Sequence, residues 1–286
     1  MKQQTVRLVV PEWQGGMDPN YQFGAQLLAQ IIPPAGLENT ETIEVPVSST
    51  AETDSHIDAE QTLLRQIRLI TDILRMKDPQ KVLTVGGDCA VSEAPFDYLH
   101  GKYPDDLGII WLDAHPDVSS DQNSDHVHEM VLANLLGYGA SKFNVVTSYP
   151  FKPENVLLAG LKVEDLRPKD QLVNDLGLRY VTPQQLMSDS HLVEDWLKER
   201  GLKHLAIHFD LDVLTPTDYR SILPADPTSR IEDFGAAVGD LRLDQVLRFL
   251  MDMDQAADVV GLTLAEHMPW DAIRLRNGLK KLQIFA

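Results

Sequence analysis

Two apolar runs of the sequence, 109–112 and 205–207, lead into polar groups whose members are spaced two residues apart. Because side chains two apart in an extended chain point to the same face, each group can present its polar atoms to one ligand. The groups are Asp113, His115 and Asp117 after the first run, and Asp210 and Asp212 after the second. Four carboxylates and one imidazole favour Mn²⁺ or a similar divalent ion over a structural zinc site. Buried together, four carboxylates would repel one another unless cations neutralised them, so the spacing predicts metal binding.

Aspartates at strand ends are also common as plain turn formers, and this is the alternative for both groups. Two separate acidic pairs, each close after a buried run, favour metal binding over that alternative. A third feature is the turn after the apolar run 81–85, where Gly86 and Gly87 indicate close backbone approach. This turn is not a phosphate loop, because the sequence has neither a following Gly-Lys-Ser/Thr nor a GxGxxG motif.

Apolar runs of strand length alternate with segments of helical periodicity along the chain. The expected strands are 5–10, 81–85, 107–112, 156–158, 178–181, 204–209 and 258–264, and the expected helices include 58–76, 132–136, 241–253 and 271–282. The polar stretches 49–59 and 119–125 are expected to be loops. Strands that are apolar throughout and separated by helices indicate a parallel sheet covered on both faces. Ligand sites of such sheets lie at the carboxyl ends of the strands, where both acidic groups fall.

The composition is that of a packed and acidic protein. The chain has 286 residues, 43% of them hydrophobic and 24% charged, which suits one large α/β domain over 1–286. No apolar run approaches the length of about 18 residues that a membrane-spanning helix needs. The formal net charge of −18 argues against nucleic-acid and anionic-membrane partners, which are polyanions themselves. The single cysteine, Cys89, excludes a disulfide within the chain and favours a cytoplasmic location.

Three motifs resemble those of one known family and occur in its order. Gly-Gly-Asp-Cys-Ala at 86–90 resembles the Gly-Gly-Asp-His-Ser motif of arginases and agmatinases. Asp-Ala-His-Pro-Asp at 113–117 matches their Asp-Ala-His-x-Asp motif. Phe-Asp-Leu-Asp at 209–212 matches their Ser-Phe-Asp-x-Asp motif, with His208 where serine is usual. With weaker similarities elsewhere, the chain resembles the arginase/agmatinase/formimidoylglutamase (ureohydrolase) family from about residue 8 to about residue 285.

The resemblance implies a fold and a set of metal ligands. The implied fold is of the α/β class. It is a three-layer α/β/α sandwich with a mainly parallel sheet of about eight strands. The implied cofactors are two divalent metal ions, expected to be Mn²⁺. The positions that match the family's ligands are Cys89, Asp113, His115, Asp117, Asp210 and Asp212.

Cys89 is the main departure from the family's pattern, because the family usually has histidine at this position. A thiolate is softer than an imidazole and favours Zn²⁺ or Fe²⁺, so Cys89 as a ligand would alter the metal preference. The alternative is that Cys89 is a small buried hydrophobic side chain beside a weakened or empty first metal site. A second departure is Glu129, which replaces the usual glycine and indicates a rebuilt loop.

The resemblance also implies catalytic and substrate-binding residues. His128 matches a histidine that transfers protons, and His126 is a competing candidate that we also expect near the substrate. Asp117 is expected to hold the proton of the nucleophile. Glu266 matches the glutamate that pairs with the substrate guanidinium, a planar cation suited to a carboxylate. Asp165 is expected, on a weaker similarity, at the far end of the substrate. The alternative for His128 and Glu266 is a solvated surface role.

The function implied is metal-assisted hydrolysis of a guanidino-type C–N bond in a small guanidino or amidino substrate. We expect an arginase-like release of urea from arginine or a related compound. The alternatives are a formimidoylglutamase-type hydrolase and a catalytically degenerate member of the family with one metal or none. A single-metal, deacetylase-like amidohydrolase is a further alternative. The resemblance also implies a homo-oligomer, either a trimer or a hexamer.

Overall fold

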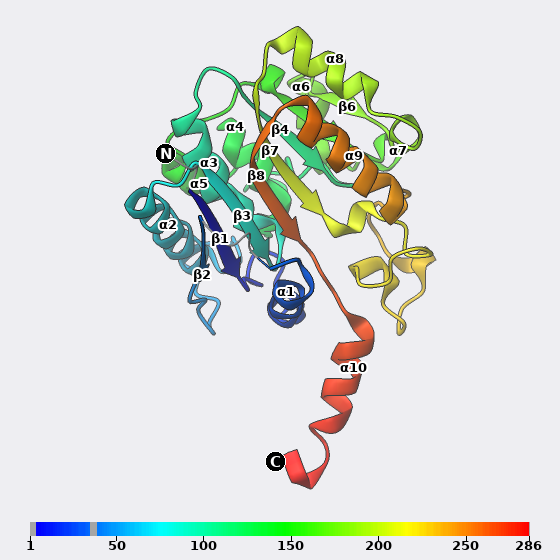
Figure 1. Cartoon of the computed structure of the whole chain (residues 1–286). Coiled ribbons are helices and arrows are strands. Elements are labelled where there is room, and N and C mark those ends of the chain that lie inside the picture. Colours follow the sequence, from blue (N-terminus) through cyan, green and yellow to red (C-terminus); the bar gives the residue numbers. More distant parts are fainter. Residues whose placement is uncertain (1–3, 35–38, 286) are drawn as a thin grey trace.

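Eight parallel strands form one sheet in the order β2-β1-β3-β8-β7-β4-β5-β6 (Figure 1). They are β1 (Thr5–Val10), β2 (Thr40–Glu44), β3 (Lys81–Gly86), β4 (Leu107–Leu112), β5 (Val156–Ala159), β6 (Arg179–Val181), β7 (His204–Asp210) and β8 (Asp258–Ala265). The structure is a computed structural model that describes residues 4–34 and 39–285. The sheet is parallel at every pairing, as the continuously apolar runs predict.

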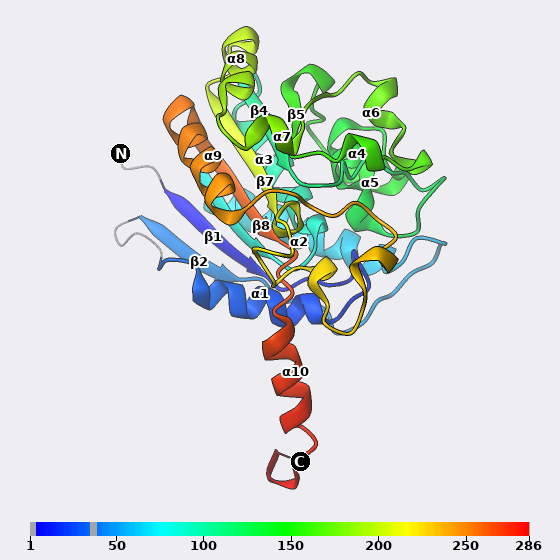
Figure 2. The same cartoon turned by 90° about the vertical axis from the view of Figure 1, so that its right-hand side faces the viewer.

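Helices cover both faces of the sheet and make three layers, which Figure 2 shows from the side. One face carries α2 (Glu60–Lys77), α3 (Glu93–Lys102), α4 (Val131–Leu136), α5 (Ser141–Val146) and α6 (Leu172–Asp175). The other carries α1 (Asn20–Ile31), α7 (Pro183–Leu186), α8 (His191–Arg200) and α9 (Leu243–Ala256). The expectation of a three-layer α/β/α fold is confirmed.

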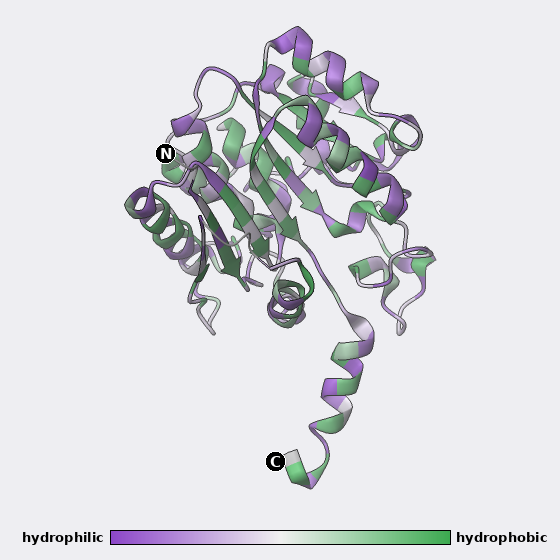
Figure 3. Ribbon diagram, viewed as in Figure 1, coloured by the Kyte–Doolittle hydropathy of each residue, from purple (hydrophilic) through white to green (hydrophobic). Residues whose placement is uncertain are grey.

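Alternation along the strands builds two separate cores. In β4, which is buried at every position, Ile109 and Trp111 enter one core while Ile110 and Leu112 enter the other. Figure 3 accordingly shows hydrophobic residues along the strands and hydrophilic ones on the outer surfaces of the helices. Since β4 has no exposed position, its sequence can be apolar throughout, and polar side chains appear only where the strand ends.

Every strand expected from the sequence is present, with bounds that differ by at most one residue. The strand that was not expected is β2, whose sequence Thr-Glu-Thr-Ile-Glu is mostly polar. It lies at the edge of the sheet, where charged residues are common because they discourage pairing with another chain. The helices α1, α3, α5, α6, α7 and α8 were also not expected, while the loops at 49–59 and 119–125 are confirmed.

The last helix, α10 (Trp270–Leu279), extends away from the sheet and its covering helices (Figures 1 and 2). Only Ile273 of this helix is buried among the described residues. Leu275 is 64% exposed and Ile284, beyond the helix end, is 85% exposed. Within 4–34 and 39–285, the chain forms no helix with the length and apolar character needed to cross a membrane.

Candidate active site

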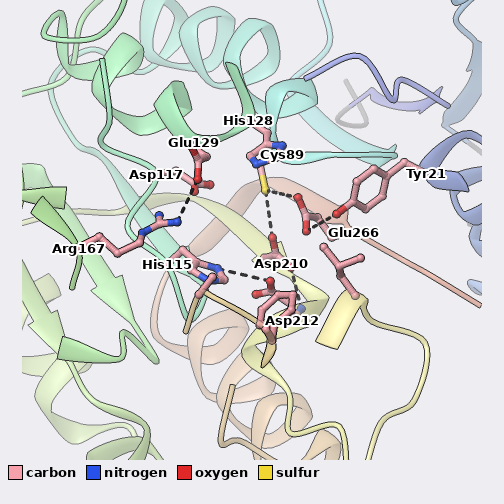
Figure 4. A pocket seen from close by; sticks show the side chains of 13 residues that line it. Tyr21, Cys89, His115, Asp117, His128, Glu129, Arg167, Asp210, Asp212 and Glu266 are labelled. Carbon is pink, nitrogen blue, oxygen red and sulfur yellow. Dashed lines mark hydrogen bonds and ion pairs between the residues drawn. The ribbon is translucent and has the colours of Figure 1, made fainter. Parts of the chain in front are cut away.

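The four central strands β3, β8, β7 and β4 are neighbours in the sheet, and their carboxyl ends meet at one place. This order brings together residues that lie far apart in the sequence (Figure 4). Cys89 follows β3, Glu266 follows β8, Asp210 and Asp212 follow β7, and Asp113, His115 and Asp117 follow β4. The acidic pairs therefore face one another at the position expected for parallel sheets.

A cavity of about 100 Å³ opens at this meeting point. It is lined by Tyr21, Cys89, His115, Asp117, His128, Glu129, Arg167, Asp210, Asp212, Leu223, Phe234, Ala236 and Glu266. Asp113 does not line it; its side chain is buried and accepts a hydrogen bond from Trp111 Nε1 at 3.2 Å. Seven of the predicted site residues thus line one cavity, and Asp113 lies in contact with them.

Two of the predicted residues are not brought to the cavity. Asp165 is exposed in a short turn (Val163–Asp165), where the neighbouring Lys162 binds Asp240 instead. His126 lies beside the cavity, with its Nδ1 3.1 Å from Asp58 Oδ2, so it is held toward the surface. The structure therefore assigns neither of them a contact with a substrate in the cavity.

Each acidic group is fixed by its own backbone. Asp113 Oδ1 accepts a hydrogen bond from the His115 amide at 2.7 Å, and Asp210 Oδ1 accepts one from the Asp212 amide, also at 2.7 Å. These bonds leave one oxygen of each carboxylate to point elsewhere, and they hold the chain in a tight turn as the strand ends. In each acidic group, the residue two positions later thus holds the carboxylate of Asp113 or Asp210 in a fixed orientation.

Two site residues adopt backbone conformations that non-glycine residues rarely take. Asp117 has φ 48° and Glu266 has φ 63°, both in the left-handed region. The Glu266 amide donates to the Gly87 carbonyl at 2.6 Å, which ties the end of β8 to the turn after β3. A Cβ at Gly87 would lie 1.6 Å from the Glu12 carbonyl oxygen, so glycine is required there. Such strain persists where the surrounding structure holds a side chain in place, and it is typical of functional sites.

The site concentrates buried negative charge. Burial raises the pKa of Asp117, Asp210 and Glu266 well above their ordinary values, and the neighbouring carboxylates raise them further. Burial also acts to lower the pKa of His115, but the charges of Asp212 and Asp113 outweigh it, and that pKa is well above the ordinary value. Across the described residues, the ion pairs of this cluster join His115 to Asp113 and Asp212, and no ion pair involves Asp117, Asp210 or Glu266.

Several buried atoms of the cluster have no hydrogen-bond partner among the described residues. They are His115 Nε2, Asp117 Oδ2, Asp212 Oδ1 and His208 Nε2. Candidate ligand atoms fall into three groups whose members lie within 4.8 Å of one another: Cys89, Asp113, Asp117 and His208; Cys89, Asp210 and Glu266; and Asp113, His115 and Asp212. Excess carboxylates and free ligand atoms at this spacing fit divalent cations, which would offset the repulsion.

Glu266 and Tyr21 form the wall opposite His115 (Figure 4). Tyr21 donates from its hydroxyl to Glu266 Oε2 at 2.9 Å, and Cys89 Sγ lies 3.4 Å from Glu266 Oε1. Cys89 also donates to Asp210 Oδ2 at 3.0 Å. Burial, followed by the charges of Glu266 and Asp210, raises the pKa of the Cys89 thiol, so without a cation the thiol is protonated.

His128 and Glu129 lie on the same wall of the cavity and have different roles in the structure. Burial lowers the pKa of His128 to about 4, so its imidazole is neutral at neutral pH. Glu129 accepts hydrogen bonds from Arg167 Nη1 at 3.0 Å and from Lys169 Nζ at 2.5 Å, and it also binds Ser124 in the loop 119–125. Glu129, which replaces the usual glycine, therefore anchors the loop 119–125. This contact explains why the loop was expected to differ from that of the family.

Sequence reasoning missed three polar residues of the site, besides the apolar lining residues Leu223, Phe234 and Ala236. Tyr21 and Arg167 line the cavity but lie in segments that carry no local signal for it. His208 was noted only as an unusual residue in a motif. It lies two residues before Asp210 on an extended strand, so the same period of two could have placed it on the face of Asp210.

Comparisons with known proteins agree with this geometry. The family model described as "Arginase family" matches residues 19–270. An arginase of Staphylococcus aureus is 26% identical over 172 residues, which are 58% of this chain and 55% of the relative. An arginase of Bacillus caldovelox is 32% identical over 147 residues, 48% of each chain. The chain thus spans about half the length of the curated relatives it matches.

Solved structures share the fold at lower sequence identity. The arginase of Entamoeba histolytica, determined with L-ornithine, has a TM-score of 0.76 and 15% identity, over 93% of this chain and 91% of that one. The arginase of Bacillus caldovelox has a TM-score of 0.71 and 20% identity, over 99% of each chain. The formimidoylglutamase of Bacillus subtilis has a TM-score of 0.66 and 13% identity, over 93% of this chain and 79% of that one. These similarities show the arrangement of the sheet and helices.

Proposed function

The chain belongs to the arginase family, and on this premise we propose that it is a metal-dependent hydrolase of a guanidino-type C–N bond. The observation that carries the proposal is the meeting of buried carboxylates from β7 and β4 with Glu266 at one cavity. A structural role alone does not account for them, because buried like charges without counter-cations destabilise a fold.

The ligands proposed for two divalent cations are Cys89, Asp113, His115, Asp117, Asp210 and Asp212. Oxygen-rich groups of this kind suit Mn²⁺, particularly the group of Asp113, His115 and Asp212. When bound, two such ions supply hydroxide from water at neutral pH. The role of the chain's own residues is to position the substrate and to move protons.

Glu266 is proposed to bind the cationic guanidinium, because its carboxylate is buried at the cavity wall and its orientation is fixed by Tyr21. Its fixed position would bring the guanidinium carbon toward the acidic cluster. Asp117 has a free oxygen, Oδ2, that can hold the proton of the nucleophile. His128 Nδ1 is also free, and a neutral imidazole can accept a proton and pass it to the leaving amine.

Arg167 bears on the choice of substrate. Its guanidinium lies at the cavity, where it donates to Asp170 and Glu129. Three of its five N–H groups are used in these pairs, since Nη2 donates to Asp170 Oδ1, and two remain for a ligand. A substrate with a carboxylate at its far end, as in arginine or formimidoylglutamate, suits these donors better than agmatine does.

We expect purified protein loaded with Mn²⁺ to release urea from arginine, and to act on agmatine at least about tenfold less well because one charge-assisted hydrogen bond is lost. The screen compares arginine, agmatine, guanidinobutyrate and formimidoylglutamate, with urea and formamide measured as products. Formamide from formimidoylglutamate alone would replace the arginase-type proposal with the formimidoylglutamase type. No product from any substrate, together with one bound metal or none, would favour the catalytically degenerate alternative.

The proposal includes a cytoplasmic homo-oligomer, a trimer or hexamer, formed by chains with one ureohydrolase domain each. The exposed apolar side chains beyond β8 support self-association, since Leu275, Leu279, Leu282 and Ile284 are all exposed on or beyond α10. The free thiol of Cys89 supports the location.

A further inference from the structure

His208 is a buried histidine in β7 whose hydrogen bonding is incomplete. Its side chain is 0% exposed and stacks on Trp111, with ring centroids 3.8 Å apart and an interplanar angle of 14°. Its Nδ1 lies 2.8 Å from Ser92 Oγ, while its Nε2 has no partner within the described part of the chain. Buried polar atoms are nearly always paired, so an imidazole nitrogen without a partner in the core indicates a ligand.

The surroundings of His208 offer ligand atoms from three other side chains. A ring nitrogen of His208, Cys89 Sγ and one carboxylate oxygen each from Asp113 and Asp117 lie within 4.8 Å of one another. All four residues are buried, with at most 4% of their surface exposed. One sulfur, one nitrogen and two oxygens at this spacing suit a divalent ion, and Asp210 Oδ2, 3.0 Å from Cys89 Sγ, is a further oxygen donor beside them.

We propose that His208 and Cys89 together ligate the first metal ion, so that the imidazole comes from β7 and a thiolate stands at the position after β3. The inference rests on the proposed function, because this ion shares Asp113 with the second site formed by His115 and Asp212. Under this inference Cys89 is a metal ligand and not merely a small buried hydrophobic side chain. Binding of the ion releases the thiol proton to solvent and leaves the thiolate as the ligand.

Two neighbours hold the His208 ring in a fixed orientation. The stacked Trp111 restricts rotation of the ring, and Trp111 itself is fixed by its hydrogen bond to Asp113. Ser92 pairs with one ring nitrogen and so determines which nitrogen is free to bind an ion. Such a partner to the second nitrogen is characteristic of histidines that ligate metals.

The donor set predicts a difference between the two sites. A thiolate and an imidazole are softer than carboxylates, so the first site should prefer Zn²⁺, Fe²⁺ or Co²⁺ to Mn²⁺. The second site, with Asp113, His115 and Asp212, keeps a majority of oxygen ligands. The chain would then hold two different metal ions rather than a matched pair of manganese ions.

Cobalt is a suitable probe because Co²⁺ bound to a thiolate gives a charge-transfer band in the near ultraviolet. The full chain is freed of metal with a chelator, reloaded with Co²⁺, and measured for metal content and absorption. We expect the wild type to bind two ions and to show the band. Cys89→Ser should lose the band, whether it binds two ions or one. His208→Gln should bind one ion. His204→Gln changes the same residue type near the start of the same strand, and it should keep both ions and the band.

An unchanged metal content and an unchanged band in His208→Gln would overturn the inference while leaving the carboxylate site and the proposed function intact. A wild type that binds no cobalt would overturn both. Should His208→Gln fail to fold, Ser92→Ala tests the same point, because Ser92 touches the ring and not the ion. We expect the first ion to bind this variant about 10–100-fold more weakly in competition with a chromophoric chelator. An unaltered affinity would contradict the role of His208.

Discussion

Asp210→Asn is expected to abolish retention of metal and to raise the thermal unfolding midpoint of the metal-free chain. The asparagine keeps an oxygen for the Asp212 amide, which now donates to Asp210 Oδ1 at 2.7 Å, so the turn after β7 is preserved. It removes a buried charge that burial and the neighbouring Asp212 and Glu266 disfavour. The same substitution therefore improves the metal-free fold and destroys the function.

The loss of metal affinity should exceed the roughly 10–100-fold that follows changes to residues behind the ligands. Metal content after dialysis and the thermal midpoint, each with and without added Mn²⁺, check both parts. Asp254→Asn, on the exposed side of α9, is the matched control and should alter neither. An Asp210→Asn protein with the metal content of the wild type would remove Asp210 from the ligand set.

Glu266→Gln should abolish most of the hydrolysis of guanidino substrates while the chain keeps its metal. The carboxylate is the buried anion proposed to face the substrate cation, and an uncharged amide leaves that cation unpaired. Removing one partner of a buried, hydrogen-bonded charge pair costs about 2 kcal/mol or more, which is a loss of at least about 30-fold in kcat/KM.

Tyr21→Phe is the graded control for this prediction. It removes the hydroxyl that donates to Glu266 Oε2 at 2.9 Å but keeps both the ring and the carboxylate. We expect a loss of about tenfold, corresponding to one hydrogen bond to a charged group. Steady-state kinetics with the substrate that the screen identifies, together with metal content, separate the two effects. A Glu266→Gln enzyme with wild-type kcat/KM would exclude Glu266 from substrate binding.

The site residues that could be predicted from the sequence are those that lie close together in it, at a regular spacing after a buried strand. Asp113, His115 and Asp117 follow a strand that is buried at every position, so the change from apolar to polar residues marks both the strand end and the site. The parallel sheet could be predicted for the same reason, because its central strands are covered on both faces.

The residues that could not be predicted depend on contacts between distant segments. Tyr21 reaches Glu266 across 245 residues of sequence, and Arg167 is positioned by its pairs with Glu129 and Asp170. Such contacts have no period in the sequence. The polar strand β2 was missed because an edge strand does not need the apolar pattern of a buried one.

Three residues that depart from the family's motifs, Glu129, Cys89 and His208, make specific contacts in the structure. Glu129 binds Arg167 and Lys169, and so gives the rebuilt loop an anchor that a glycine could not provide. Cys89 and His208 are departures in two different motifs, yet their side chains meet at the same carboxylates. Cys89 and His208 each differ from the residue usual in the family, and together they belong to one candidate metal site.

The most direct test of the central claim is the metal content per chain of protein purified without chelator, measured again after loading with Mn²⁺. Two divalent ions per chain are predicted, because two groups of ligand atoms share Asp113 at one cavity. No bound metal after loading would contradict the account, since hydrolysis at this site requires the cations that its buried carboxylates are proposed to hold.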